Sequence, residues 1–412
     1  MRTGTSDIIL ILFLMSTLFA LQGHADMPKS RSCYRDIDTS DMSAFAKPVN
    51  FLLLMGLCTL IHTTQAYIHP KIYFDPMSSF SIQVTGASGF LGAHVVHQLL
   101  EAGYRVRASA RTPKVNIVKE GWLSYGHKFE VVAVDDLATG DLTDALKGVG
   151  AIVHVAAPLA MAGPPDVVIS VRVFRPCHTI TLPSFTDTTL SGAVDGTLNV
   201  LKQGYAAGVR KFVVTSSIST AFDVLDVKST VQANRNSWNP ASVELAREGK
   251  YGPGYTYGAA KLPPNGNFGH LRMRTQTPTS PVLVLPAPRG KYSSWLGWAD
   301  VRDVARAHVR ALSVGPLPDR THKRLLLGEF VDYPKAVEYI LEQRPELKGR
   351  TVDPKDAPWS PTGWVSDLDI TEQVLGIKRE EFYSWQEMVL AAVDATLTLE
   401  KEWAAKGLTL DI

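Results

Sequence analysis

The chain has 412 residues, of which 45% are hydrophobic and 20% charged, and its formal net charge is +2. This length and balance allow an enzyme-sized unit of one or two domains to bury a sizeable core. A nearly balanced charge gives no reason to expect nucleic acid as a partner. The 3 cysteines and 11 histidines show no zinc-type spacing, so no metal site is expected.

The first 76 residues differ in character from the rest of the chain. Residues 8–21 form an apolar run of signal-peptide length, and the small residues Gly23 and Ala25 follow it. This run predicts a secreted or membrane-anchored protein, or else an extension outside the fold of a cytoplasmic enzyme that begins near Met77. No N-x-S/T acceptor occurs after residue 76, which favours the cytoplasmic interpretation.

A glycine-rich turn between a strand and a helix is the most informative motif. Residues 80–85 have strand character and precede Gly86, Gly89 and Gly92, after which a helical apolar pattern and a second strand follow. The G-x-x-G-x-x-G spacing is one residue wider than the usual dinucleotide fingerprint. Its β-α-β context nevertheless predicts a pyrophosphate site at the helix N-terminus. The expected cofactor contacts in this turn are Gly86, Gly89, Phe90, Leu91 and Gly92.

The second strand ends at Arg111, where NAD-binding folds usually place an acidic residue for the ribose 2′-hydroxyl. No carboxylate occurs between Glu101 and Glu120. A guanidinium offers paired N–H donors that suit a 2′-phosphate. A solvated surface arginine is the alternative, yet the position at the strand end favours NADP(H) over NAD(H) as the cofactor.

Strands and helices alternate along the chain after Arg111. Strand character recurs at residues 129–134, 151–157 and 211–215, and helical patterns occur at residues 141–147 and 193–207. This alternation predicts an α/β fold with a Rossmann-like, doubly wound parallel sheet. The carboxyl ends of such strands face the ligand crevice. The residues expected on that edge are Asp136, Ala156, Ala157 and Ser217.

Ser217, Tyr257 and Lys261 are the candidate catalytic residues. Tyr257 and Lys261 are four residues apart, so they share one face of a helix. A nearby ammonium lowers the pKa of a tyrosine from about 10, and the phenol can then donate a proton to a developing alkoxide. Ser217 follows an apolar strand and can hydrogen-bond the same oxygen. A Y-x-x-x-K pair alone is common, and its place after a nucleotide fold gives it weight.

The chain resembles the extended short-chain dehydrogenase/reductase superfamily. The matching stretches are VTGASGFLG, VRASARTP, VDDL, IVHVAAPLA, GTLNVL, VRKFVVTSS, YGAAK and WADVRDVARAHVRAL. They look like the branch that holds dihydroflavonol reductases, cinnamoyl-CoA reductases and fungal NADPH-dependent aldehyde and methylglyoxal reductases. The resemblance implies a catalytic triad of Ser217, Tyr257 and Lys261. It also implies cofactor contacts by Arg111, Lys119, Asp136, Leu137, Val155, Ala156, Ala157, Tyr257 and Lys261.

Three features depart from that family pattern. Residues 171–191 interrupt a helix and show no helical period, so they are expected to be an insertion. Pro263 and Pro264 follow Lys261 and would end the helix that carries the catalytic pair, within an atypical stretch at residues 262–290. The long substrate loop of the family is missing before residue 298. These departures predict that NADPH binds while carbonyl reduction is weak or absent.

The tail after residue 312 is expected to form a small substrate-binding part, following a dinucleotide-binding domain at residues 77–312. Helical patterns at residues 333–341 and 385–406 enclose a proline-rich stretch. Trp359, Trp364 and Tyr383 either face a substrate pocket or, as is more usual for aromatic residues, belong to the core.

Together these features predict an NADP(H)-dependent oxidoreductase that reduces an aldehyde or ketone by hydride transfer. Its partner is expected to be a small carbonyl or alcohol substrate, and membrane contact is expected only if residues 8–21 act as an anchor. One alternative is a sugar-nucleotide epimerase or hydroxysteroid dehydrogenase of the same superfamily. Another is a dinucleotide-binding protein whose catalysis is impaired.

Overall fold

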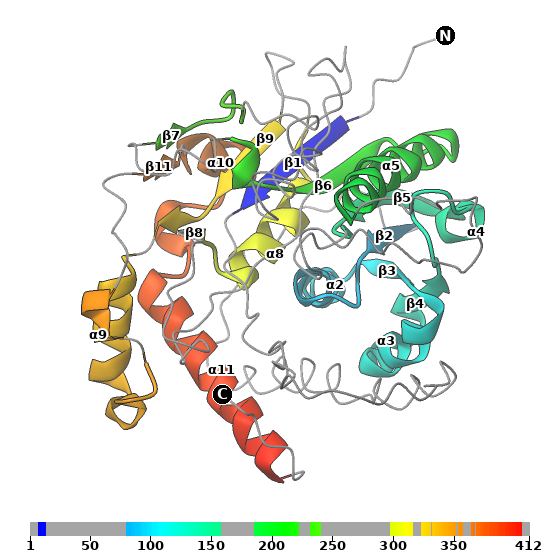
Figure 1. The fold of residues 1–412 in the computed structure, drawn as a ribbon. Coiled ribbons are helices and arrows are strands. Elements are labelled where there is room, and N and C mark those ends of the chain that lie inside the picture. Colours follow the sequence, from blue (N-terminus) through cyan, green and yellow to red (C-terminus); the bar gives the residue numbers. More distant parts are fainter. Residues whose placement is uncertain are drawn as a thin grey trace, which may run out of the picture.

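The computed structural model describes the glycine-rich turn, the strands around it and most of the C-terminal part. The described residues are 7–13, 80–157, 185–221, 231–239, 297–315, 323–330, 332–351, 353–356, 364–366 and 368–405. Figure 1 shows a central sheet with helices on both faces, and the C-terminal helices α9 and α11 to one side of it.

The central sheet has seven strands in the order β4-β3-β2-β5-β6-β1-β9, and every neighbouring pair is parallel. The strands are β1 Asp7–Phe13, β2 Ser81–Thr85, β3 Arg105–Ala110, β4 Phe129–Ala133, β5 Val149–His154, β6 Lys211–Ser217 and β9 Lys323–Leu327. The predicted Rossmann-like α/β class is therefore confirmed.

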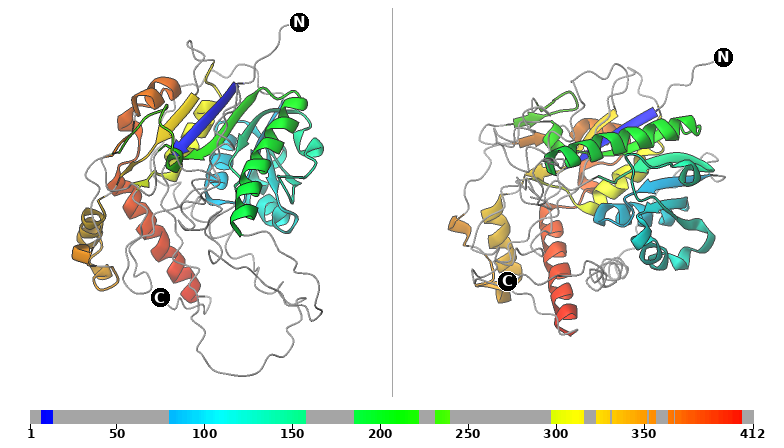
Figure 2. Two further views of the ribbon diagram at one scale, coloured as in Figure 1. Left: turned by 45° about the horizontal axis from the view of Figure 1, so that its top comes forward. Right: turned by 45° about the vertical axis from the view of Figure 1, so that its right-hand side comes forward.

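Each face of the sheet carries its own apolar core, because successive side chains of a strand point to opposite faces. Along β5, Ala151 and Val153 join one core, and Ile152 joins the other. Helices α2 and α8 contribute to the first core, and α5 to the second, so they cover opposite faces (Figure 2). The helices of this part are α2 Phe90–Glu101, α3 Val115–Gly121, α4 Thr143–Leu146, α5 Phe185–Ala206 and α8 Val301–Ala311.

Strand β1 lies within residues 1–76, which the sequence predicts to be an extension outside the fold. Figure 1 shows it inside the sheet, where Phe13 is in register with Ser217 of β6 and Leu10 with Arg324 of β9. A strand buried in a parallel sheet reads as a continuous apolar run, which is also how a signal-peptide core reads. Among the described residues, no helix is both long and apolar enough to cross a bilayer.

Helix α5 overlaps the insertion predicted at residues 171–191. It begins at Phe185, so residues 185–191 belong to the helix that covers the second core. This first part carries three threonines, an aspartate and a serine rather than an apolar stripe, and its sequence therefore lacks a clear helical period. Residues 158–184 lie outside the described part of the chain.

The sheet also extends past the domain boundary expected at residue 312, because β9 lies beyond it. Farther along, α9 Tyr333–Gln343 and α11 Trp385–Ala405 share a separate small core that includes Ile340 and Val389. The remaining elements are α10 Leu368–Leu375 and two short strand pairs, β8 Gly297–Trp298 with β10 Glu329–Phe330 and β7 Val231–Ala233 with β11 Trp364–Ser366. Short 3-10 helices are Thr112–Lys114, Leu123–Lys128, Ile218–Thr220, Pro345–Leu347, Pro354–Asp356 and Arg379–Glu381.

Candidate functional site

The candidate site is built at the carboxyl edge of the parallel sheet. Because all seven strands run in one direction, the residues that follow them meet at a single edge. The structure brings five predicted positions to that edge, from four neighbouring strands and β6. They are Gly86 after β2, Arg111 after β3, Asp136 after β4, Val155 after β5, and Ser217 at the end of β6.

The glycine-rich turn passes so close to the end of β5 that side chains are excluded from it. Gly86 has φ +72°, and a Cβ there would lie 2.7 Å from the backbone nitrogen of Ala156. A Cβ on Gly92 would lie 2.0 Å from the carbonyl oxygen of Gly86. Gly89 is the N-cap of α2 and forms no side-chain cap, and no acidic residue occupies the first turn. The helix N-terminus therefore presents backbone N–H groups suited to a pyrophosphate.

A buried hydrogen-bond chain fixes the end of β5 against this turn. The hydroxyl of Thr85 accepts from the backbone N–H groups of Val155 and Ala156, both at 3.2 Å, and lies 2.8 Å from Nδ1 of His154. Nε2 of His154 lies 3.2 Å from the hydroxyl of Thr197, which itself donates to a carbonyl of α5. This arrangement requires neutral His154 with its proton on Nε2. Sequence reasoning found Val155 and Ala156 but missed the three side chains that hold them.

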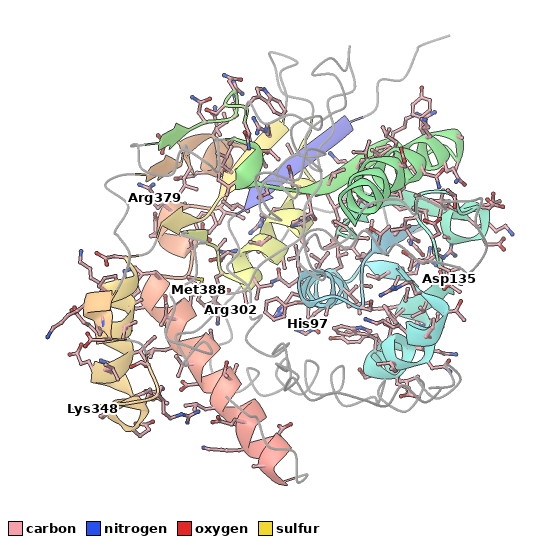
Figure 3. All side chains as sticks on the ribbon, in the orientation of Figure 1. His97, Asp135, Arg302, Lys348, Arg379 and Met388 are labelled. Carbon is pink, nitrogen blue, oxygen red and sulfur yellow. The ribbon has the colours of Figure 1, made fainter. Side chains whose placement is uncertain are left out.

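The end of β3, where the sequence predicts a 2′-phosphate contact, holds more charged groups than Arg111 alone. Asp135, labelled in Figure 3, accepts from the backbone N–H and the hydroxyl of Thr112, both at 2.7 Å. These two donors, together with nearby Arg111, lower the pKa of the Asp135 carboxyl. Desolvation and the charge of Arg111 lower the pKa of Lys114. The structure thus gathers Arg111, Lys114 and Asp135, while Lys119 is exposed farther along α3.

The predicted adenine loop after β4 is held by its own turn and by α5. The Asp136 carboxylate accepts from the backbone N–H of Ala138 at 2.7 Å and from the hydroxyl of Thr139. These hydrogen bonds lower the pKa of Asp136. Asn199 on α5 donates to the carbonyl oxygen of Leu137 at 3.0 Å. The loop is therefore pre-shaped by its own hydrogen bonds before any ligand arrives.

Ser217 is buried at the end of β6, and the strand beneath it is anchored to α8. Thr215 lies 2.8 Å from Nε2 of His308, whose Nδ1 is 2.7 Å from a carbonyl oxygen of its own helix. Complete burial lowers the pKa of His308 to about 4, so it is neutral and accepts from Thr215. Tyr257 and Lys261 lie outside the described residues.

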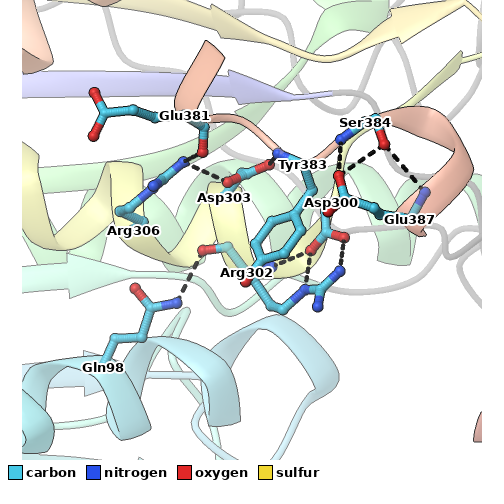
Figure 4. Close-up of polar contacts among 9 residues, drawn as sticks. All are labelled: Gln98, Asp300, Arg302, Asp303, Arg306, Glu381, Tyr383, Ser384 and Glu387. Atoms are coloured by element: carbon cyan, nitrogen blue, oxygen red, sulfur yellow. Dashed lines mark hydrogen bonds and ion pairs between the residues drawn. The ribbon is translucent and has the colours of Figure 1, made fainter. Parts of the chain in front are cut away.

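A polar cluster joins α8 to the C-terminal part (Figure 4). Asp300 accepts from Arg302 through two nitrogens, at 2.9 and 2.6 Å, and the Arg302 guanidinium lies 3.5 Å from the centre of the Tyr383 ring. Asp303 accepts from Arg306 at 2.6 Å and from the backbone N–H of Tyr383 at 2.8 Å. Tyr383 therefore packs against Arg302, at the contact between α8 and the C-terminal part of the chain. Trp359 and the side chain of Trp364 fall outside the described residues.

Known proteins that are similar to this chain include NAD(P)H-binding proteins, in agreement with the glycine-rich turn described above. A family model for NAD(P)H-binding proteins matches residues 86–248. Aldehyde reductase 2 of Sporidiobolus salmonicolor is 31% identical over 170 residues, which are 40% of this chain and 43% of that protein. The putative NADPH-dependent methylglyoxal reductase GRP2 of Candida albicans is 26% identical over 349 residues, covering 74% of this chain and 96% of that protein. The chain thus aligns with less than half of the first relative and nearly all of the second.

Solved structures show the same fold. Yeast methylglyoxal/isovaleraldehyde reductase Gre2, complexed with NADPH, aligns with a TM-score of 0.59 at 23% identity, over 78% of this chain and 99% of that one. The described residues therefore share the Rossmann-like fold of this reductase. Over residues 86–248 the chain is thus similar to NAD(P)H-binding proteins, and over most of its length it is similar to NADPH-dependent reductases.

Proposed function

We propose that this chain is an NADP(H)-dependent carbonyl reductase, with a small aldehyde or ketone as its substrate. The observation that carries the proposal is the shared edge of the sheet, where a turn too close to Ala156 for any side chain lies near the strand that ends in Ser217. Such a turn and an uncapped helix N-terminus fit a pyrophosphate. The aldehyde and methylglyoxal reductases among its relatives support the carbonyl substrate class.

Three side chains are assigned to the chemistry. Bound NADPH would supply the hydride. Ser217 orients the carbonyl oxygen and stabilises the charge that develops on it. Tyr257 donates a proton to that oxygen, and Lys261 lowers the pKa of the phenol. The assignment of Tyr257 and Lys261 rests on their spacing and on the superfamily resemblance.

The choice of NADP(H) over NAD(H) is assigned to Arg111 together with Lys114. Both cations lie beside the end of β3, where the ribose of a dinucleotide is held in this fold. A guanidinium binds phosphate through two parallel N–H groups, and an ammonium adds a point charge. Asp135 approaches the same corner, and its negative charge opposes a 2′-phosphate.

We also propose a cytoplasmic location. Removal of residues 1–25 as a signal peptide would take β1 out of the sheet, where it joins β6 to β9. A protein that depends on this strand keeps its N-terminal segment. A fluorescent protein fused at the C-terminus, with fractionation of the expressing cells, tests this proposal, and recovery of a shortened protein in the medium would overturn it.

Two measurements on the purified chain test the enzymatic proposal. Fluorescence titration with NADPH and NADH is expected to show tighter binding of NADPH. NADPH oxidation is then followed with a panel of aldehydes and ketones, alongside Ser217→Ala as the inactive control. Interconversion of a nucleotide sugar without net NADPH oxidation would favour the epimerase alternative, and oxidation of a hydroxysteroid alone would favour the dehydrogenase. Tight NADPH binding without any turnover would favour the impaired dinucleotide-binding protein.

A further inference from the structure

Arg324 on β9 is a fully buried arginine with an unusual set of partners. Its exposed fraction is 1%, and it is the largest of the fully buried side chains in the described part of the chain. One terminal nitrogen donates to the carbonyl oxygen and to the hydroxyl of Thr220, both at 3.0 Å. The other donates to the carbonyl oxygens of Arg235, at 3.2 Å, and Ser237. No carboxylate of the described residues forms an ion pair with it.

A buried guanidinium that no carboxylate of the described residues pairs with is a costly choice for packing alone. Burial of a charge is unfavourable unless it is paired or fully hydrogen-bonded, and apolar side chains of similar volume often pack as well or better. Burial lowers the pKa of Arg324 to about 9, and its Nε has no hydrogen-bond partner among the described residues. The indole of Trp238, 3.7 Å from the guanidinium carbon, offsets part of this penalty. The position therefore needs what a guanidinium supplies, which is several donors in one rigid plane.

Those donors hold the turn that follows Ser217. The Thr220 hydroxyl, which accepts from Arg324, donates to the carbonyl oxygen of Ser217 at 2.6 Å. The Thr220 carbonyl oxygen, a second acceptor for Arg324, also accepts from the backbone N–H of Asn239 at 2.9 Å. Arg324 is thus two hydrogen bonds away from the Ser217 backbone. It also fastens residues 235–239, after which the chain continues to Tyr257, to the same turn.

We propose that Arg324 is a positioning residue for Ser217, acting through Thr220. The guanidinium spans the Ser217 turn and the segment of residues 235–239 from the neighbouring side of the sheet, where Figure 1 shows β9 close to β6 with β1 between them. Its fixed geometry sets the position of the Ser217 backbone and hence of the hydroxyl that orients the substrate oxygen. This inference rests on the proposed function for the role of Ser217, whereas the contacts of Arg324 stand independently of it.

Hydrogen exchange on the full chain tests the positioning without requiring turnover. Thr220→Val removes the hydroxyl that links Arg324 to Ser217, and Thr220→Ser retains it. We expect amide exchange in residues 215–221 and at Asn239 to become at least tenfold faster in Thr220→Val and in Arg324→Lys, and to stay within twofold in Thr220→Ser. Thr371→Val is the matched control, because Thr371 is also buried and donates to β9, at the Leu326 carbonyl oxygen. Equal exchange in Thr220→Val and Thr371→Val would overturn the proposal.

A double-mutant cycle then tests whether the positioning acts through Ser217. We expect Arg324→Lys and Thr220→Val to lower kcat at least tenfold while the NADPH dissociation constant stays within twofold. In the Ser217→Ala background the same substitutions are expected to lower kcat by less than twofold, because the positioned hydroxyl is already absent. Equal losses in both backgrounds would reduce Arg324 to a structural role and refute the inference. If Ser217→Ala leaves kcat unchanged, the proposed function of Ser217 fails instead, and hydrogen exchange alone decides the positioning.

Discussion

The two halves of the carboxyl edge are built in different ways. The nucleotide half, around Gly86, Arg111 and Asp136, uses residues that follow consecutive strands, and its hydrogen bonds join Thr112 to Asp135 across 23 residues and Thr85 to Val155 across 70. The Ser217 half depends on elements that are distant in sequence. Arg324 reaches it across 104 residues, and His308 reaches its strand across 93. The first half therefore combines a local glycine-rich turn with contacts of up to about 70 residues, and the second depends on contacts that span 93 and 104 residues.

Removal of the N-terminal segment is the strongest test of this contrast. A chain that lacks residues 1–76 loses β1, which joins β6 to β9. We expect β6 and β9 of this shortened chain to be largely unfolded and to show no cooperative thermal transition. The free energy of unfolding of a domain is only about 5–15 kcal/mol, and the loss of an internal strand removes much of it. Thermal unfolding and amide exchange of β6 and β9 measure the effect.

A chain that lacks only residues 1–5 is the control, since it retains all of β1. It is expected to melt like the full chain. If the chain without residues 1–76 has an unchanged melting temperature and unchanged exchange in β6, then β1 is dispensable. In that case the apolar sequence at residues 282–285 is the first candidate for its place in the sheet.

The nucleotide half was predictable because its signals are local. A strand, three glycines and an amphipathic helix follow each other within residues 80–101, and each pattern has its own period. These patterns predicted that Asp136, Ala156, Ala157 and Ser217 lie at one edge of the sheet, and the structure places these positions at or after the ends of β4, β5 and β6. Lys114 and Asp135 were not predicted, although both are near the ends of predicted strands, because only one charged residue was sought for the ribose.

The Ser217 half was predictable only in part. The strand ending in Ser217 has a clear apolar pattern, whereas the roles of His308 and Arg324 depend on contacts between distant elements that no local period encodes. The apolar stretch at residues 8–21 was ambiguous for a physical reason, since a signal-peptide core and a buried parallel strand have the same composition. The lack of a helical period at residues 171–191 hid the start of α5 at Phe185, because the helix is polar there.

Tyr257→Phe tests the chemistry of the Ser217 half. The substitution removes the proton donor and leaves the nucleotide half intact, so we expect turnover to fall by roughly 10²–10⁴ with little change in NADPH affinity. Steady-state kinetics and a binding titration separate the two effects. Unchanged turnover would show that another group supplies the proton. If the native chain itself shows weak turnover, the proline pair after Lys261 accounts for it, as the sequence predicts.

The cluster that joins α8 to the C-terminal part makes stability depend on pH. Burial raises the pKa of Asp303 to about 7, and nearby Asp300 raises it further, against the opposing effects of Arg306 and Arg302. Because this value lies above the ordinary value of 3.8, the stabilisation is complete below pH 4 and is lost as the pH rises through 7. We expect the free energy of unfolding to fall over that window by up to about 4 kcal/mol.

Asp303→Asn is expected to flatten this pH dependence, which denaturant titrations between pH 4 and pH 8 would measure. Asp394→Asn is the matched control, since Asp394 forms an exposed ion pair with Arg344 on the C-terminal helices. It should keep the slope of the native chain. If the free energy of unfolding of the native chain rises between pH 4 and pH 7, and this rise is absent in Asp303→Asn, the assigned pKa is contradicted.

Arg111→Ala tests the nucleotide half directly. We expect it to weaken NADPH by about 1.5–3 kcal/mol, the contribution of a charge-assisted contact, and to change NADH binding little. Lys114→Ala should act in the same direction with a smaller effect, because an ammonium makes no bidentate contact. Lys119 lies on the exposed part of α3 and is the lysine that the resemblance implies. The NADPH affinity of Lys119→Ala, compared with that of Lys114→Ala, shows which of the two lysines contributes to binding. If Arg111→Ala weakens the binding of NADPH and NADH equally, Arg111 does not hold the 2′-phosphate.

The smallest expected effect concerns Asp135, which the structure places beside Arg111. Its carboxylate is exposed and interacts with Arg111, the residue proposed to hold the 2′-phosphate, so its charge is expected to oppose NADPH and not NADH. Asp135→Asn keeps an acceptor for the Thr112 donors and removes the charge. We expect NADPH affinity to rise by roughly two- to fivefold at low salt and NADH affinity to stay constant, with the gain lost at high salt because exposed charges are screened. A loss of NADPH affinity would instead show that Asp135 serves the nucleotide half by holding the Thr112 turn, and that this local contact outweighs its charge.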